Sequence, residues 1–135
     1  MKNTFLILAL LLSMSAFSQE PAKNAGLIVG NDGKAHIKFE TTVIDFGKIK
    51  KDVPVEKEFA FSNSGSAPLI ITSANKSCGC TTPRIPTEAI LPGKKSVIGA
   101  GFNAHNLGGF SKTITVVSNA EENNIILTIK GEVVE

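Results

Sequence analysis

Apolar and polar side chains alternate in short runs along most of this chain from residue 36 onward. In residues 55–63, Val55, Phe59 and Phe61 share one face, and Lys57 interrupts this apolar row near its start. Alternation with a period of two is typical of a β-strand with one buried face. No segment shows a sustained helical period, so the pattern predicts an all-β chain.

The other runs complete the predicted set of strands. Residues 36–39 and 43–46 open the sheet, and Gly47 is expected to end the second run. Residues 69–71 are wholly apolar, which predicts a strand buried on both faces. Three later strands are expected at residues 97–102, 110–118 and 125–133, with an inward row of Ile98, Ala100, Phe102, Phe110, Ile114, Val116, Ile125, Leu127, Ile129 and Val133.

Proline and glycine refine this prediction. Pro83 and Pro86 have no amide proton to donate, so residues 81–86 are expected to form an edge or a loop. Gly99 and Gly101 lie opposite the inward row of their strand, where the missing side chains let another group approach closely. About seven antiparallel strands result, which favours an immunoglobulin-like β-sandwich of two packed sheets.

The N-terminus has the features of an export signal. Lys2 precedes an apolar run over residues 5–12, and Ala16 and Ser18 are small residues at the positions that a signal peptidase reads. We therefore expect a signal peptide over residues 1–18, cleaved before Gln19. The alternative is a retained anchor, but the run is shorter than the roughly 20 residues that span a bilayer. The expected location is periplasmic or extracellular.

The predicted domain begins after a leader. Residues 19–34 mix Pro, Asn, Gly and Lys and are expected to be flexible, with an extra edge strand at residues 27–29 as the alternative. Residues 35–135 are expected to form the single immunoglobulin-like domain.

Composition narrows the classes of partner. The whole chain has 14 basic and 12 acidic residues, and removal of the signal takes away only Lys2, which leaves 13 basic residues. A charge so close to neutral provides no broad basic surface, so no nucleic-acid partner is expected. Trp and Tyr are absent and both methionines lie in the signal. We expect no integral membrane segment after cleavage, and a protein or a cell-envelope component as the partner.

No motif in the chain indicates an enzyme. The nucleophile elbow, the zinc-protease helix, the phosphate loop and the dinucleotide fingerprint are all missing from the sequence. Asp45 could serve acid–base chemistry with a second carboxylate, but beside Gly47 it is more typical of a turn or register device. The expectation is therefore a protein without catalytic residues or a cofactor.

Cys78 and Cys80 are the only cysteines, separated by Gly79. In an oxidising compartment they are expected to form a local disulfide, because Gly79 relieves the backbone of so small a ring. A loop this short stabilises the fold little and is opened readily by an outside thiolate. One interpretation is therefore thiol–disulfide exchange, to which Lys76 could contribute by favouring a thiolate.

Two further interpretations of the cysteines stay open. Both could bind Cu(I) or Zn²⁺, for which only His36 and His105 offer additional nitrogen ligands. The pair could also be a purely structural feature that fixes a corner where the chain changes sheets. The identity of any metal is unknown at this stage.

An ordered set of motifs resembles a known family. The motifs are residues 44–47 (IDFG), 59–63 (FAFSN), 68–71 (PLII), 77–81 (SCGCT), 91–93 (LPG), 109–110 (GF) and 118–119 (SN). Together they resemble the secreted immunoglobulin-like family of unknown function, of DUF1573 type, that is common in the Bacteroidetes and has a Cys-Gly-Cys turn. Its fold is related to the ASH and major-sperm-protein sandwiches, which are binding and scaffolding modules. The resemblance therefore implies a sandwich fold and a non-enzymatic role.

These observations lead to one hypothesis and one alternative. We expect an exported, non-enzymatic binding or scaffolding module that contacts its partner through an edge strand or through the loops at one end. The alternative is a thiol–disulfide or Cu(I)-handling protein that acts through Cys78 and Cys80.

Overall fold

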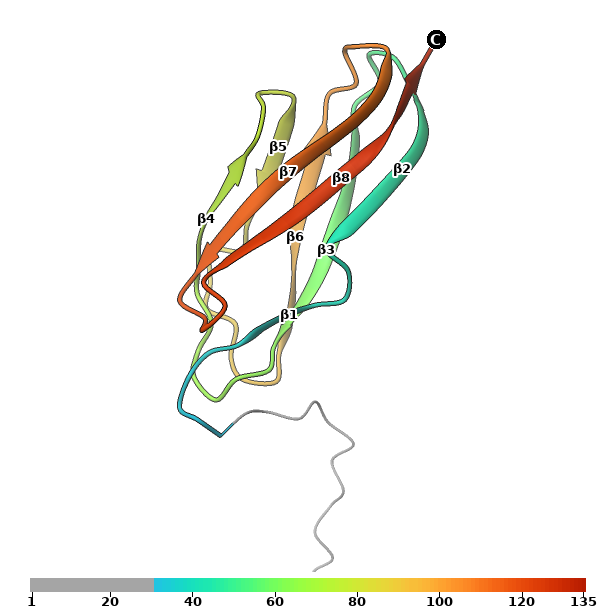
Figure 1. Ribbon diagram of the computed structural model, residues 1–135. Helices are drawn as coiled ribbons and strands as arrows, with labels where there is room; N and C mark the ends of the chain where they lie inside the picture. Colours follow the sequence, from blue (N-terminus) through green and yellow to red (C-terminus); the bar gives the residue numbers. More distant parts are fainter. Residues whose placement is uncertain (1–30) are drawn as a thin grey trace, which may run out of the picture.

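The computed structural model describes residues 31–135. The predicted signal peptide and residues 19–30 of the predicted leader lie outside the described residues. Within them the chain forms eight strands and no helix (Figure 1). The strands are β1 (Ile37–Phe39), β2 (Val43–Lys50), β3 (Val55–Asn63), β4 (Ile71–Lys76), β5 (Thr81–Arg84), β6 (Lys95–Phe102), β7 (Gly108–Ser118) and β8 (Asn124–Val134).

The strands form two four-stranded sheets that pack face to face. Sheet A has the order β1-β3-β6-β5 and sheet B has the order β2-β8-β7-β4. Strands β4 and β5 are consecutive in the chain but belong to different sheets, so the turn between them crosses the sandwich. This arrangement confirms the predicted immunoglobulin-like all-β sandwich.

The core lies between the sheets and includes most of the predicted inward rows, although Val55, Phe110 and Ile125 are only partly buried. The side chains of Phe59, Ile98, Leu127 and Ile129 are completely buried, and they come from β3, β6 and β8. Ile126, which alternates with two of them, is 61% exposed. The period of two therefore separates the core from solvent as predicted, because each strand has one face against the opposite sheet.

The structure corrects the expected end of β2 at Gly47. The strand continues to Lys50, and the register with β8 shifts between Asp45 and Lys48. Gly47 has a φ of 68°, and its amide donates to Asp45 Oδ1 over 2.8 Å. Gly47 is therefore part of a β-bulge, for which a left-handed glycine is well suited. Asp45 holds this local turn, as its position beside the glycine indicated.

Strand β2 also pairs in parallel with β8, whereas the other strand pairs are antiparallel. The prediction of a strand buried on both faces at residues 69–71 is wrong as well. Leu69 is buried and forms a single bridge to Ile90, Ile70 is 47% exposed, and β4 begins only at Ile71. Because all three residues are apolar, the sequence pattern did not indicate that Leu69 is buried and Ile70 exposed.

The prediction of an edge or loop at residues 81–86 is confirmed, since residues 81–84 form the edge strand β5 and residues 85–86 lie outside any strand. Strand β5 pairs only with β6, and Pro83 lies within it. Gly99 on β6 lies beneath the Arg84 side chain, since a Cβ at Gly99 would be 3.2 Å from Arg84 Nε. Arg84 also forms an ion pair with Glu56 of β3. The close approach predicted for Gly99 is thus made by an arginine.

Asn63, at the end of β3, connects several segments in the interior. Its side chain is fully buried, and its Nδ2 donates to the carbonyl oxygens of Ala67 at 2.7 Å and Ile90 at 2.9 Å. Its Oδ1 accepts from the amides of Gly65 at 2.9 Å and His36 at 3.4 Å. One amide side chain thereby bonds four buried or half-buried backbone groups, of which, within the described residues, only the Ile90 carbonyl has a second partner, the Leu69 amide at 2.8 Å.

Replacing Asn63 with alanine is expected to lower the free energy of unfolding by about 3 kcal/mol, because the Ala67 carbonyl and the amides of Gly65 and His36 lose their partner. Urea denaturation of the purified domain measures this change. Asn124→Ala, at an exposed position, is the control and should shift stability by no more than about 0.5 kcal/mol. Equal effects of the two substitutions would contradict the role assigned to Asn63.

Candidate functional site at the sheet-crossing turn

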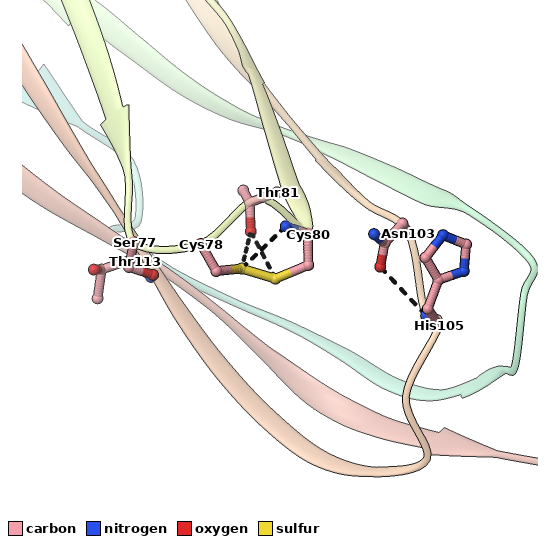
Figure 2. The surroundings of a disulfide bond; sticks show 7 residues. All are labelled: Ser77, Cys78, Cys80, Thr81, Asn103, His105 and Thr113. Carbon is pink, nitrogen blue, oxygen red and sulfur yellow. Dashed lines mark hydrogen bonds between the residues drawn. A yellow bond between two sulfur atoms is a disulfide. The ribbon is translucent and has the colours of Figure 1, made fainter.

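The two cysteines lie on the turn that connects β4 in sheet B with β5 in sheet A. The structure joins Cys78 and Cys80 in a disulfide, with their Cα atoms 5.4 Å apart (Figure 2). Both cysteines are half-buried, and Gly79 between them is exposed. The pair therefore lies at a corner where the chain changes sheets, the position that the structural interpretation expected.

Backbone hydrogen bonds hold this turn on both sides. Toward sheet B, the Ser77 amide donates to the Thr113 carbonyl at 2.9 Å, and the Thr113 amide donates to Ser77 Oγ at 3.0 Å. Toward sheet A, the Asn103 amide donates to the Cys80 carbonyl at 3.0 Å. The entrance and the exit of the turn are thus each tied to a neighbouring strand or its extension.

Thr81 is the residue of this site that the sequence analysis did not single out. Its side chain is completely buried at the start of β5. Its Oγ1 lies 3.7 Å from Cys78 Sγ and 4.0 Å from Cys80 Sγ. A disulfide sulfur carries no proton, so the hydroxyl is the donor. The one available signal was the position of Thr81 directly after Cys80.

The candidate metal ligands are not brought to the cysteines. His36 pairs with Glu122 of the β7–β8 turn, and this turn lies at the opposite end of the sandwich from the turn between β4 and β5 (Figure 1). His105 is closer to the turn in Figure 2, but its Nδ1 pairs with Asp52 at 2.9 Å. Lys76 ends β4 with an exposed side chain. Among residues 31–135, no group of three or more His, Cys, Asp or Glu residues is arranged to hold a metal ion.

The sandwich has four edge strands, and three of them carry features that discourage pairing with another chain. Strand β1 has only three residues, β5 contains Pro83, and β2 is bulged at Gly47 and ends with Lys48 and Lys50. Strand β4 has six residues, no proline, and no charge before Lys76; its register shift lies at its start, between Ile71 and Ser73, and Ser73–Lys76 pair regularly with β7. Of the described edges, β4 is therefore the one best suited to accept a further strand.

The free side of β4 can be assigned from its pairing with β7. The Ser77 amide points to β7, and Lys76 pairs with Ile114 in a regular register that begins at Ser73. Amides alternate in direction along an antiparallel strand. The amides of Ala74 and Lys76 therefore point away from β7, toward solvent.

No helix within residues 31–135 is long and apolar enough to cross a bilayer. This finding concerns only the part of the chain that the structure describes.

Comparison with known proteins gives a family match and several similar folds. The family model described as "Protein of unknown function (DUF1573)" matches residues 37–133. No curated protein matches the sequence.

Among solved structures, a protein of unknown function from Porphyromonas gingivalis W83 has a TM-score of 0.63 at 14% identity, over 81% of this chain and 50% of that one. The ASH/PapD-like domain 7 of human CEP192 has a TM-score of 0.61 at 9% identity, over 100% of this chain and 97% of that one. The secreted serine protease VesC from Vibrio cholerae has a TM-score of 0.55 at 10% identity, over 73% of this chain and 23% of that one. This chain thus spans half the length of the Porphyromonas protein, and at these identities the likeness concerns the fold alone.

His36 is a charged link between the segment before β1 and the β7–β8 turn. Its Nε2 lies 2.6 Å from Asp32 Oδ2, and its Nδ1 lies 3.0 Å from Glu122 Oε1. The hydrogen bond with Asp32, followed by that with Glu122, raises the pKa of His36. The hydrogen bond with His36 lowers the pKa of Asp32. Burial acts to raise the pKa of Glu122, but its hydrogen bonds, first that with His36, lower it overall.

The stabilisation by His36 is therefore expected to depend on pH. Because the folded-state pKa of His36 is raised, its contribution is complete below its ordinary pKa of about 6.5 and is lost as the pH rises through the folded value. The carboxylate contributions are present above their ordinary pKa values near 4 and are lost as the pH falls through the lowered ones.

We predict that the difference in Tm between the wild type and His36→Gln is larger at pH 6 than at pH 9, measured by circular dichroism. Lys38→Gln, two residues further along the chain and without a hydrogen bond or ion pair to Asp32 or Glu122, is the control. An equal difference in Tm at both pH values would show that the interactions of His36 with Asp32 and Glu122 add nothing to stability.

Proposed function

The chain belongs to the family described as Protein of unknown function (DUF1573), and we propose that it is an exported, non-enzymatic binding module. In this proposal, an extended segment of another envelope protein adds as a fifth strand to the free edge of β4. The single observation that carries the proposal is the difference between this edge and the other three.

Strand addition needs a row of free amides and carbonyls on a straight edge. The amides of Ala74 and Lys76 meet this need, because their direction follows from the pairing of β4 with β7. The exposed side chains beside them are small or polar, as in Thr72 and Asn75. Most of the affinity would therefore come from main-chain hydrogen bonds, which tolerate a range of partner sequences.

Further support comes from the sequence. The near-neutral charge offers no nucleic-acid surface, and the resemblance to the ASH and major-sperm-protein sandwiches favours a binding or scaffolding role. The features of residues 1–18 support export, with residues 19–34 as a leader and residues 35–135 as the domain. The module would then be periplasmic or extracellular.

A random peptide library displayed on phage and selected on the mature domain tests the binding edge directly. Selected peptides are expected to slow hydrogen exchange at the amides of Ala74 and Lys76, measured by nuclear magnetic resonance. Ala74→Pro removes one outward amide and should weaken binding by about tenfold or more, because it deletes one hydrogen bond and places a ring on the edge.

The matched control for this experiment is Ala74→Ser, which keeps the amide and should bind as the wild type does. Thermal melts of both variants separate a loss of binding from a loss of fold. Protection confined to the loops at either end of the sandwich, or equal binding by both variants, would refute the assignment to β4.

The export part of the proposal predicts a defined N-terminus. After expression of the full chain in a Gram-negative host, the protein recovered from the periplasm is expected to begin at Gln19, as determined from its intact mass. Replacing Ala16 with a bulky residue such as phenylalanine should block cleavage, because the peptidase requires a small side chain there. A cell-associated protein that still carries residues 1–18 would contradict export with cleavage.

A further inference from the structure

The disulfide contributes little to holding the turn in which it lies. It closes a loop with a sequence separation of two, and the entropy removed by so short a loop is small. The hydrogen bonds of Ser77 with Thr113 and of Asn103 with Cys80 fix both ends of the turn without it. The bond between the sulfurs can therefore open while the two sheets stay packed.

The surroundings of the two sulfurs are unequal. Cys78 Sγ accepts from the Cys80 amide at 3.3 Å and lies 3.7 Å from Thr81 Oγ1, whereas Cys80 Sγ has only the longer contact of 4.0 Å with the same hydroxyl (Figure 2). Donors of this kind stabilise a sulfur that takes on negative charge. If the bond breaks, the electron pair is held better on Cys78 than on Cys80.

Thr81 provides the second observation that points to this chemistry. A fully buried hydroxyl normally bonds to a backbone carbonyl or another oxygen. Among the described residues, the only hydrogen-bond partners of the Thr81 hydroxyl are the two sulfurs. Its position at the start of β5, paired with Phe102 of β6, keeps it fixed when the disulfide opens.

We propose that the Cys78–Cys80 disulfide is a thiol–disulfide exchange site with a fixed direction, in which a cysteine thiolate of another protein attacks Cys80 and Cys78 leaves. This goes beyond the proposed binding role and does not depend on it. Thr81 acts as a positioning residue, because its hydroxyl favours the negative charge on Cys78.

The exchange balances without any further oxidant or reductant. The partner thiolate forms a bond to Cys80 Sγ, the Cys78–Cys80 bond breaks, and its electron pair goes to Cys78 Sγ. A second thiolate of the partner then attacks the partner sulfur of the mixed disulfide, and Cys80 leaves as a thiolate. The partner gains a disulfide, and this domain is left with two thiols.

The direction can be read from the position of the mixed disulfide. The oxidised mature protein is treated briefly with glutathione, quenched with acid, alkylated and cleaved with trypsin. Both cysteines lie on the peptide of residues 77–84, between Lys76 and Arg84, so fragment ions that separate at Gly79 distinguish them. We expect glutathione on Cys80 and the alkyl group on Cys78, with an excess of about tenfold over the reverse arrangement.

Two variants test the part played by Thr81. Thr81→Val removes the hydroxyl at nearly constant shape and should reduce the preference for Cys80 to the part that the Cys80 amide provides, whereas Thr81→Ser should keep the full preference. This ratio is insensitive to a general loss of stability, which circular dichroism measures separately.

Three results would overturn the proposal. The first is glutathione mainly on Cys78, or evenly on both cysteines, in the wild type. The second is an unchanged ratio in Thr81→Val. The third is a disulfide that does not react with millimolar glutathione over hours. The disulfide would then have a structural role only. Each of these results leaves the binding experiment on β4 unaffected.

Discussion

The structure depends on one constraint, which is that each sheet can remove its apolar face from water only by covering the other. The four strands with the most completely buried side chains, β3, β6, β7 and β8, occupy the two central positions of each sheet. Hydrophobic burial is thereby concentrated at the centre of the sandwich. The outer strands contribute less to the core, so their sequences are freer to meet other requirements. Both candidate functions are found among these outer strands.

The two proposals concern adjacent parts of one side of the molecule. Strand β4 is an edge of sheet B, β5 is an edge of sheet A, and the cysteine turn connects them. A segment bound along β4 would end close to Cys78, since this strand stops at Lys76. The fold thus presents a main-chain binding edge and a half-buried disulfide next to each other. Neither requires a cavity.

The sequence predicted the features that depend on local pattern. Alternation identified the buried rows that contain Phe59 and Leu127, and Pro83 identified an edge. The sequence pattern could not predict features that depend on a residue far away in the chain. The parallel pairing of β2 with β8 and the continuation of β2 beyond Gly47 arise from contacts across the whole domain. The role of Thr81 was equally hidden, because only the folded turn shows that its hydroxyl is directed at sulfur.

The position of β8 determines when sheet B can finish folding. Val43 of β2 pairs with Thr128 of β8, and β8 separates β2 from β7 in sheet B. Strand β2 therefore has no hydrogen-bonded neighbour in its sheet until the last strand arrives. Contacts between residues so far apart in the chain form late and slowly. In a polypeptide threaded N-terminus first through a secretion channel, sheet B would consequently stay incomplete until nearly all of residues 31–135 had emerged.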